Sequence, residues 1–321
     1  MGSSTPQLLN ALEDLGCSIV QDAPLARRVF WRTGGTADVL VDATTAEQVA
    51  QIQRISQEHS TSITILGAGS NVLISDDGIR GITLCLGGDL KAVEVLKEHP
   101  NEMRLRVGAG LKLVAFLNRV KRLEVGGFGA LVGVPGTIGG AVRMNAGTSL
   151  GWTSDFLESI TIALNGTLET VDAEALAMRY RWCALPEGAI ITTADLVGKR
   201  TDLEADREAN RAHLVHRKRT QPLDKPSCGS VFTNPEGDHA GRLIEAAGLK
   251  GHRIGDAQIS DLHANFIVNL GQATANDVLD CIRLAWETVG ERFDVWMRPE
   301  VELLGDWPEH AWPLVPPPES G

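Results

Sequence analysis

The stretch at residues 129–147 constrains this chain more than any other part of its sequence. Its nineteen residues include six glycines and one proline, and Arg143 is the only charged residue among them. Flexible linkers are usually polar or charged, so this composition does not describe one. We interpret the stretch as a buried backbone surface that lies against a flat ligand. A tightly packed loop between domains is the alternative.

A second glycine segment has the sequence Gly-Ala-Gly-Ser-Asn at residues 67–71, between two apolar runs. Glycines let backbone amides approach an anion closely, and the serine and asparagine add hydrogen-bond donors. The segment is not the dinucleotide-binding fingerprint G-x-G-x-x-G, because Val72 follows and a strand-like run replaces the helix. A phosphate cradle and an ordinary tight turn both stay open at this point.

Length, charge and cysteine content limit the class of protein. A chain of 321 residues exceeds what one core usually organises, so we expect two or three domains. The net charge of −11 does not favour nucleic acid or an anionic membrane as a partner. The five scattered cysteines lack a C-x-x-C pair, which favours a reducing compartment over disulfides or structural zinc.

His213 and His216 have no third ligand at a suitable spacing, so no metal site is expected. We expect no secretory signal or membrane span, and the cytoplasm as the location.

Local patterns predict a mixture of helices and strands. Thr45 with Gln48 forms a potential capping box, and Asn165-Gly166 predicts a tight hairpin turn. A similar capping pattern begins at Thr274. We expect two strands within 29–42 around a Gly34-Gly35 turn, a strand at 63–66, exposed antiparallel strands at 84–107 and a hairpin at 158–172. We expect helices from residue 45, at 111–120, at 204–219 as a charged domain linker and from residue 274, with a loose tail after residue 305.

Three polar side chains lie far apart in sequence, each at the edge of an expected element. Ser230 follows two prolines and a glycine, Glu300 precedes a strand-like run, and Arg181 follows Tyr180. A hydroxyl, a carboxylate and a guanidinium could form one site assembled from several segments. Taken singly, a loop serine or a buried Arg–Glu pair is ordinary. We interpret Cys228, two residues before Ser230, as a packed small residue rather than a nucleophile.

In combination, these motifs resemble those of the UDP-N-acetylenolpyruvoylglucosamine reductase family, in its shorter type II branch. The resemblance covers residues 27–305, nearly the whole folded chain. The motifs that carry it are Thr-Gly-Gly-Thr-Ala at 33–37, Gly-Ala-Gly-Ser-Asn at 67–71, Gly-Val-Pro-Gly-Thr-Ile-Gly-Gly at 133–140, Met-Asn-Ala-Gly at 144–147, Tyr180-Arg181, Gly-Ser-Val-Phe at 229–232, Asn234-Pro235, Ala-Gly-Arg-Leu-Ile-Glu-Ala-Ala-Gly-Leu-Lys-Gly at 240–251, His-Ala-Asn-Phe-Ile-Val-Asn at 263–269 and Pro-Glu-Val at 299–301.

The resemblance implies an α+β fold. A two-subdomain FAD-binding unit of the vanillyl-alcohol-oxidase type precedes a C-terminal α+β substrate domain. We expect FAD-binding subdomain 1 at 20–86, FAD-binding subdomain 2 at 87–202, the substrate-binding domain at 203–305 and a proline-rich tail at 306–321.

The resemblance also implies cofactors and partners. FAD is expected to bind non-covalently, in agreement with the absence of any histidine between His99 and His213. NADPH is the implied hydride donor and a UDP-sugar enolpyruvyl ether the implied substrate. We expect a cytoplasmic monomer that binds neither nucleic acid nor membrane.

The implied reaction reduces the enolpyruvyl group of UDP-N-acetylglucosamine enolpyruvate to UDP-N-acetylmuramate in peptidoglycan precursor synthesis. Hydride passes from reduced FAD to carbon 3, and Ser230 donates a proton to carbon 2. Arg181 and Glu300 stabilise the charge that develops on the substrate carboxylate. The implied cofactor-binding residues are Gly67, Ala68, Gly69, Ser70, Asn71, Gly133, Pro135, Gly136, Thr137, Ile138, Gly139, Gly140, Asn145 and Gly147, and the implied substrate-binding residues are Tyr180 and Asn234.

The chain departs from the family pattern at a few positions. Thr233 stands where a lysine often precedes Asn-Pro, which affects the expected contacts to substrate phosphate. Thr-Ser-Leu-Gly at 148–151 replaces the usual Ala-Tyr-Gly-Gly. Two other functions stay open: a related FAD-dependent oxidase, whose reduced flavin would react quickly with oxygen, and a catalytically silent protein that binds FAD or a UDP-sugar.

Overall fold

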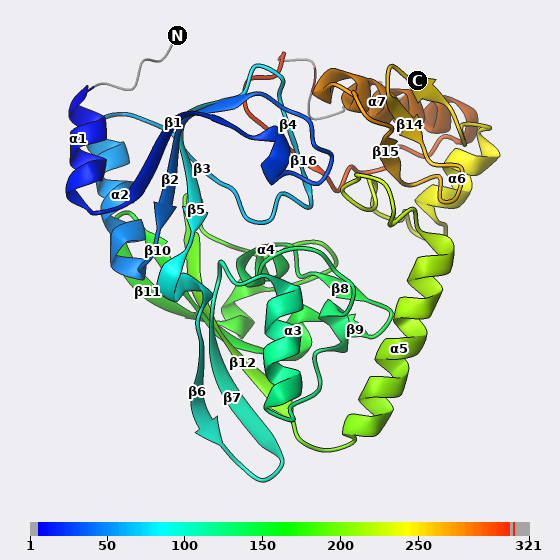
Figure 1. Cartoon of the computed structure of the whole chain (residues 1–321). Coiled ribbons are helices and arrows are strands. Elements are labelled where there is room, and N and C mark those ends of the chain that lie inside the picture. Colours follow the sequence, from blue (N-terminus) through cyan, green and yellow to red (C-terminus); the bar gives the residue numbers. More distant parts are fainter. Residues whose placement is uncertain (1–5, 309–310, 312–321) are drawn as a thin grey trace. The chain divides into compact units, whose positions relative to one another are not determined.

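The computed structural model describes residues 6–308 and residue 311 (Figure 1). The chain divides into two compact units. The chain passes from one unit to the other at residues 21/22, 37/38, 68/69, 80/81 and 217/218. Each unit is therefore assembled from segments that are distant in sequence.

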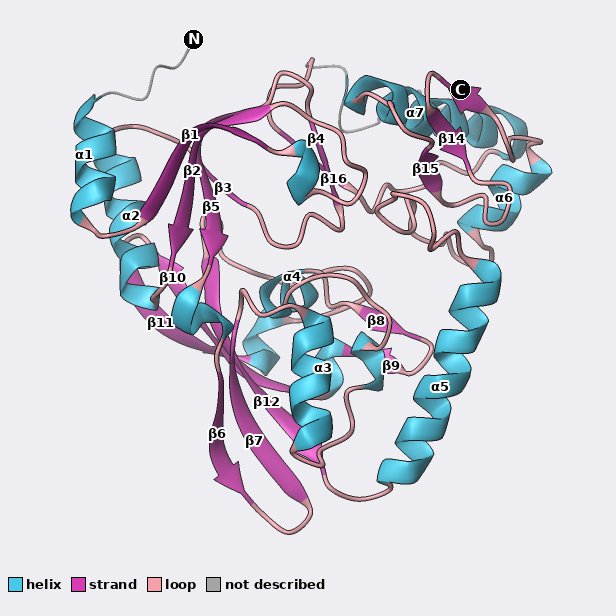
Figure 2. Cartoon of the chain, viewed as in Figure 1, coloured by secondary structure: helices cyan, strands magenta, loops and turns pink. Residues whose placement is uncertain are grey.

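The first unit contains a five-stranded antiparallel sheet (Figure 2). In spatial order its strands are β11 (Thr167–Asp172), β10 (Leu157–Leu164), β12 (Ile190–Lys199), β7 (Glu102–Gly108) and β6 (Val93–Glu98). The predicted hairpin is confirmed, because Leu164 pairs with Thr167 across a turn. Asn165 and Gly166 have φ values of 51° and 79°, and a two-residue I′ hairpin turn needs positive φ at both positions. Helix α3 (Leu113–Arg122) buries Phe116 in the same cluster as the apolar residues of β7 and β12.

A second sheet contains the N-terminal strands. Its spatial order is β1 (Ser18–Pro24), β2 (Thr36–Ala43), β5 (Ile79–Leu86) and β3 (Ile63–Ile65). Helices α1 (Pro6–Asp14) and α2 (Ala46–Glu58) bury Leu12 and Ile52 in one cluster with Val41 of β2. The predicted start of α2 is confirmed: Thr45 Oγ1 accepts a hydrogen bond from the backbone N–H of Gln48 at 3.2 Å, which satisfies a free donor at the helix end.

The expectation of two strands within 29–42 is wrong in its first half. β2 begins at Thr36, whereas residues 29–35 form no strand and follow a short 3-10 helix, η1 (Ala26–Arg28). Trp31 is fully buried, and its indole Nε1 donates to the Ile267 carbonyl oxygen at 2.7 Å. The apolar residues of this segment are therefore explained by tertiary burial, which overrides strand propensity.

Helix α5 (Leu203–Thr220) confirms the predicted charged helix, and none of its residues is buried. The chain passes from the first unit to the second near its end, at 217/218. The first unit also contains several short elements: η2 (Gly88–Lys91), η3 (Gly129–Leu131), α4 (Ile138–Arg143), β8 (Gly147–Thr148), β9 (Gly151–Trp152), η4 (Thr153–Asp155) and η5 (Ala173–Leu176).

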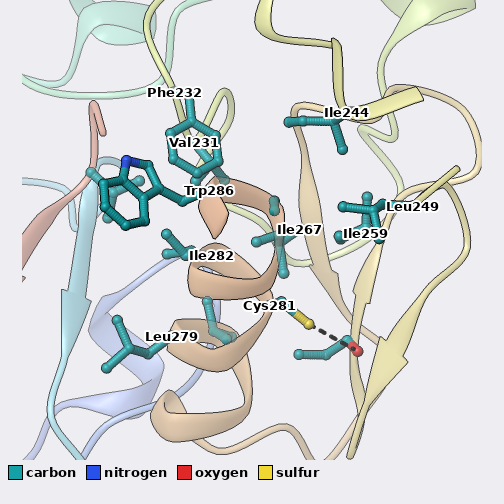
Figure 3. Packing of buried hydrophobic residues seen from close by; sticks show 14 of the residues in the cluster. Val231, Phe232, Ile244, Leu249, Ile259, Ile267, Leu279, Cys281, Ile282 and Trp286 are labelled. Carbon is teal, nitrogen blue, oxygen red and sulfur yellow. Dashed lines mark hydrogen bonds between the residues drawn. The ribbon is translucent and has the colours of Figure 1, made fainter. Parts of the chain in front are cut away.

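The second unit is organised around helix α7 (Ala275–Phe293), which begins at the predicted capping box of Thr274 and Asp277. Figure 3 shows buried residues of this core, among them Ile282 and Trp286 on α7. The Cys281 thiol lies 3.7 Å from the Ala257 carbonyl oxygen. The other elements of the unit are α6 (Ala240–Ala246), the sheet of β13 (Arg253–Ile254), β14 (Ala257–Ile259) and β15 (Ile267–Asn269), and the parallel pair β4 (Val72–Ile74) and β16 (Glu302–Leu304).

None of the helices in the described part of the chain is both long and apolar enough to cross a membrane. The proline-rich tail predicted at 306–321 lies largely outside the described residues.

The core of the second unit provides a stability prediction. Ile282→Ala should lower the free energy of unfolding by about 2–5 kcal/mol, because it removes buried methyl groups and leaves a cavity. The control is Val215→Ala on α5, where the side chain is 55% exposed and the change should stay within about 0.5 kcal/mol. Urea unfolding followed by tryptophan fluorescence measures both. Equal effects of the two substitutions would contradict the assignment of Ile282 to the core.

Candidate active site

The two glycine segments meet in the first unit. A Cβ atom at Gly67 would lie 3.2 Å from Thr137 Oγ1. The same Thr137 Oγ1 accepts a hydrogen bond from the Gly140 amide at 3.3 Å and caps α4. Gly67, the first residue of the shorter segment, therefore lies beside Thr137 of the longer one, and both were expected to contact a cofactor.

Glycine is required for different physical reasons at different positions of the longer stretch. Gly136 has a φ of 145°, which side-chain-bearing residues rarely adopt. Gly139 is a packing position: its amide donates to the Ala109 carbonyl oxygen at 2.8 Å, and a Cβ there would lie 3.0 Å from the Ala109 Cβ. Gly140 is exposed, and a Cβ there would meet only Thr137 Oγ1, at an ordinary 3.6 Å. Gly140 therefore has no packing requirement of its own in this structure.

The exposed positions fit a phosphate-bearing planar cofactor such as FAD. Gly67, Gly133 and Gly140 are exposed, although much of the surrounding chain is buried. Without side chains, their backbone amides can be approached closely by an anion or by a ring system. Among the other cofactor-binding residues expected here, Pro135 is exposed, Ile138 is buried, and Ala68 and Ser70 are half-buried.

Gly69 is better explained as a turn. Its φ is 66°, and a Cβ would lie only 2.3 Å from the Arg28 carbonyl oxygen. Its own carbonyl oxygen accepts from the Phe30 amide at 2.9 Å and lies 3.6 Å from the Cys228 sulfur. Burial raises the pKa of the Cys228 thiol to about 12. Because only the thiolate is a good nucleophile, Cys228 is unsuited to that role.

Asn71 supports the position of Glu300 within the second unit. Its side-chain Nδ2 donates to the Glu300 carbonyl oxygen at 2.9 Å, and its own carbonyl oxygen accepts from the Glu302 amide at 3.0 Å. The parallel pairing of β4 with β16 continues from this point. Asn71 is expected to contact the cofactor, and within the second unit its amide nitrogen contacts the backbone of a candidate catalytic residue.

Backbone hydrogen bonds place Ser230 and Glu300 on adjacent segments of the second unit. Ser230 forms a bridge with Phe266. The next residue, Val231, donates its amide to the Asn265 carbonyl oxygen at 2.9 Å and accepts from the Glu300 amide at 2.8 Å. The structure therefore brings together two of the three candidate catalytic residues, which are seventy positions apart.

Asn265 is a site-supporting residue that the sequence reasoning did not single out. It is 3% exposed, and its side chain satisfies both backbone groups of Phe232: the Phe232 amide donates to Oδ1 at 3.0 Å, and Nδ2 donates to the Phe232 oxygen at 2.8 Å. A buried amide that is paired through both its oxygen and its nitrogen in this way fixes the chain beside Ser230. Its only signal in the sequence was its place inside the motif at 263–269.

Two neighbouring polar residues differ in their availability to a ligand. Thr233 is buried, and its hydroxyl donates to the Arg298 carbonyl oxygen at 3.1 Å. Asn234 is exposed, and its Oδ1 accepts from the Ala240 amide at 3.1 Å at the start of α6. The Thr233 hydroxyl therefore stabilises the local fold. Among the described residues, the side-chain nitrogen of Asn234 has no backbone acceptor, so this nitrogen is the group that a ligand can use.

Arg181 lies at the tip of a tight turn in the first unit. Arg179 and Trp182 pair across the turn, with Tyr180 and Arg181 between them. Arg181 has a φ of 53°, which is uncommon for a residue with a side chain. The buried side chain of Asn145 holds the turn, because its Nδ2 donates to the Arg179 carbonyl oxygen at 3.2 Å. Asn145 was expected to contact the cofactor, and here it supports the arginine turn.

Trp152 packs beside the arginine turn, and the sequence patterns did not identify it as a site residue. Its ring lies edge-on to Tyr180 with 5.5 Å between the ring centroids. The Arg181 guanidinium carbon lies 5.9 Å from the Trp152 ring and 5.4 Å from the Tyr180 ring. Gly147 makes room for the tryptophan, because a Cβ there would overlap the Trp152 ring at 2.3 Å. Packing therefore requires a glycine at position 147, which is also one of the residues expected to contact the cofactor.

Two protein-family models match this chain. The FAD binding domain family model matches residues 37–172, and the UDP-N-acetylenolpyruvoylglucosamine reductase C-terminal domain model matches residues 221–304. The expected fold class, an α+β FAD-binding part followed by a C-terminal domain, is thereby confirmed.

Full-length relatives extend the match across both parts. The UDP-N-acetylenolpyruvoylglucosamine reductase of Myxococcus xanthus is 43% identical over 292 residues, which cover 91% of this chain and 94% of that protein. The reductase of Bacillus velezensis is 38% identical over 290 residues, which cover 89% and 94%. The crystal structure of the reductase from Thermus caldophilus superposes with a TM-score of 0.76 at 34% identity, covering 90% of this chain and 98% of that one. This chain therefore belongs to the UDP-N-acetylenolpyruvoylglucosamine reductase family of FAD-containing oxidoreductases.

Proposed function

We propose that the protein reduces the enolpyruvyl group of UDP-N-acetylglucosamine enolpyruvate to UDP-N-acetylmuramate, with NADPH as the electron donor. Hydride adds at carbon 3 and a proton adds at carbon 2, so the carbon–carbon double bond becomes a single bond while NADPH becomes NADP⁺. We place this activity in the cytoplasm and in a monomer. We also retain the division into FAD-binding subdomains at 20–86 and 87–202 and a substrate-binding domain at 203–305.

The flavin would be held by the exposed glycine backbone around Gly67, Gly133 and Gly140. When bound, FAD accepts hydride from NADPH and supplies it to the substrate. The chain contributes backbone without side chains at Gly67 and Gly140, and the Thr137 hydroxyl lies close to both. At Gly133 the side chains of Leu214 and Arg217 border the exposed backbone. Such a preformed surface lowers the entropy cost of binding.

Three side chains of this chain would carry the substrate chemistry. Arg181 binds the substrate carboxylate and stabilises the negative charge that develops there, and Glu300 in its protonated form donates a second hydrogen bond to it. Ser230 delivers the proton to carbon 2. Tyr180 and Asn234 would contact the substrate beside these groups.

One observation carries the proposal: the bonding of Val231 to both Asn265 and Glu300. A proton donor and a charge-stabilising group must be held at fixed positions relative to one reacting carbon skeleton. Neighbouring hydrogen-bonded backbone segments provide that rigidity for Ser230 and Glu300. The adjacent backbone segments of Ser230 and Glu300 support a catalytic role over ligand binding alone.

The flavin surface can be tested without disturbing its packing. Gly140→Val should yield folded protein that binds flavin poorly, because a Cβ at Gly140 has room in the protein while the branched side chain would occupy the flavin surface. Gly87→Ala is the control, since a Cβ there also meets its nearest atom at 3.6 Å and lies outside both glycine segments. Absorbance of bound flavin and circular dichroism measure the two properties. Full flavin content in Gly140→Val would show that the surface is assigned wrongly.

Ser230→Ala separates the two half-reactions. Reduction of the flavin by NADPH should keep its rate, because no substrate proton moves in that step. Reoxidation by the enolpyruvyl substrate should slow by at least about 10²-fold, since general acids typically contribute 10²–10⁴-fold. Stopped-flow absorbance follows both steps. Equal slowing of both would remove Ser230 from the proton-donor role, and rapid reoxidation of the wild type by oxygen alone would favour a flavin oxidase.

Arg181→Lys and Glu300→Gln test whether the two groups act on one developing charge. Lysine keeps the charge but loses the planar fork, and glutamine keeps a donor but cannot be protonated and deprotonated. Each substitution should slow substrate reduction by roughly 10²–10³-fold, the usual cost of losing one such donor. The double variant should lose less than the product of the two effects, because groups acting as a unit are non-additive. If the variants had lower melting temperatures but their folded fraction kept full turnover, Arg181 and Glu300 would have a structural role only.

A further inference from the structure

The Arg181 side chain lies near two aromatic rings, those of Tyr180 and Trp152, and of these Trp152 has no part in the reaction proposed above. Trp152 and Tyr180 stand edge to face at an interplanar angle of 81°. The guanidinium carbon of Arg181 lies within 6 Å of both ring centroids, at 5.9 Å and 5.4 Å. At these separations the negative face of an aromatic ring attracts a cation.

An aromatic support suits an arginine that must bind a carboxylate. A long side chain has many rotamers, and an arginine that samples them would meet its substrate in the required orientation only part of the time. The face of an aromatic ring attracts the cation and so limits the orientations that the guanidinium samples.

The Trp152 ring is itself held firmly. The pairing of β8 with β9 places Gly147 opposite Trp152, and the absence of a side chain at Gly147 lets the ring lie against the backbone. The Trp152 amide donates to Asp155 Oδ2 at 2.8 Å. Asn145, which holds the backbone of the arginine turn, also accepts from the Ser154 amide at 3.0 Å. The turn and the tryptophan are thus anchored to the same short segment.

We propose that Trp152 is a positioning residue, which orients the Arg181 guanidinium for the substrate carboxylate. This inference rests on the proposed function, because it assigns Trp152 a part in the same substrate step. It does not require Trp152 to touch the substrate or the flavin. Trp152 lies directly after the Thr-Ser-Leu-Gly segment at residues 148–151.

The test uses the full-length flavoprotein and compares Trp152→Leu with Trp152→Phe. In Trp152→Leu, reoxidation of reduced flavin by the enolpyruvyl substrate should slow by roughly 3- to 30-fold, the range that cation–π contacts contribute. Flavin content and the rate of flavin reduction by NADPH should stay at the wild-type values. Trp152→Phe keeps a ring face and should recover most of the lost rate.

Trp182→Leu is the matched control. Trp182 belongs to the same turn but lies under Arg179, whose guanidinium carbon is 4.1 Å from its ring, so its removal should not slow the substrate step selectively. Equal loss in Trp182→Leu and Trp152→Leu, or a loss spread over both half-reactions, would overturn the proposal. If Trp152→Leu does not fold, Trp152→Met, which also lacks a ring, replaces it: a selective loss in the substrate step supports the proposal, and wild-type kinetics overturn it.

A double variant links the effect to the arginine. In an Arg181→Lys background, Trp152→Leu should slow the substrate step less than it does in the wild type, because the contact to be lost has already been altered. An unchanged effect would overturn the positioning role. The proposed function fails separately, since in that case wild-type flavin would not be reoxidised by the enolpyruvyl substrate at all.

Discussion

The burial of Trp31 in the second unit is the interaction on which much of that unit depends. Its indole donates to Ile267, and the Asn269 side chain donates back to the Trp31 carbonyl oxygen at 2.8 Å. The two bonds tie an N-terminal segment to β15, more than two hundred positions later. A buried ring satisfied at both its indole and its backbone is costly to displace. The segment 22–37 therefore belongs to the same compact unit as the C-terminal elements.

The segment that Trp31 anchors also determines what the glycine segment at 67–71 packs against. Gly69 packs against the backbone of Arg28 and Phe30 and against the Cys228 sulfur. Two residues later, Asn71 bonds to Glu300. A run of five residues that looks like one loop in sequence thus has two parts. Gly67 lies against Thr137 in the first unit, while Gly69 and Asn71 support the candidate catalytic segment of the second.

The longer glycine stretch shows the same division between packing and surface. Gly139 and Gly147 are needed because Ala109 and Trp152 occupy the space of a side chain, whereas Gly140 is limited by nothing nearby. Close packing makes the first kind of glycine intolerant of any substitution. The second kind has no packing reason of its own, which agrees with the proposal that a ligand approaches the backbone there. Glycine content alone could not separate the two, since both reasons select the same residue.

The sequence by itself determined the local elements and the chemical inventory. The capping boxes at Thr45 and Thr274, the Asn165-Gly166 turn and the charged helix α5 all follow from short-range hydrogen bonding and periodicity, and the structure contains each of them. The motif set was sufficient to place the chain in its family. Only the tertiary structure decided that residues 29–35 form no strand, that Asn71, Asn145 and Gly147 support neighbouring segments, and that Asn265 and Trp152 stand beside the candidate catalytic residues. These facts depend on contacts between distant segments, and a sequence pattern carries no information about which buried partner a polar or aromatic side chain will meet.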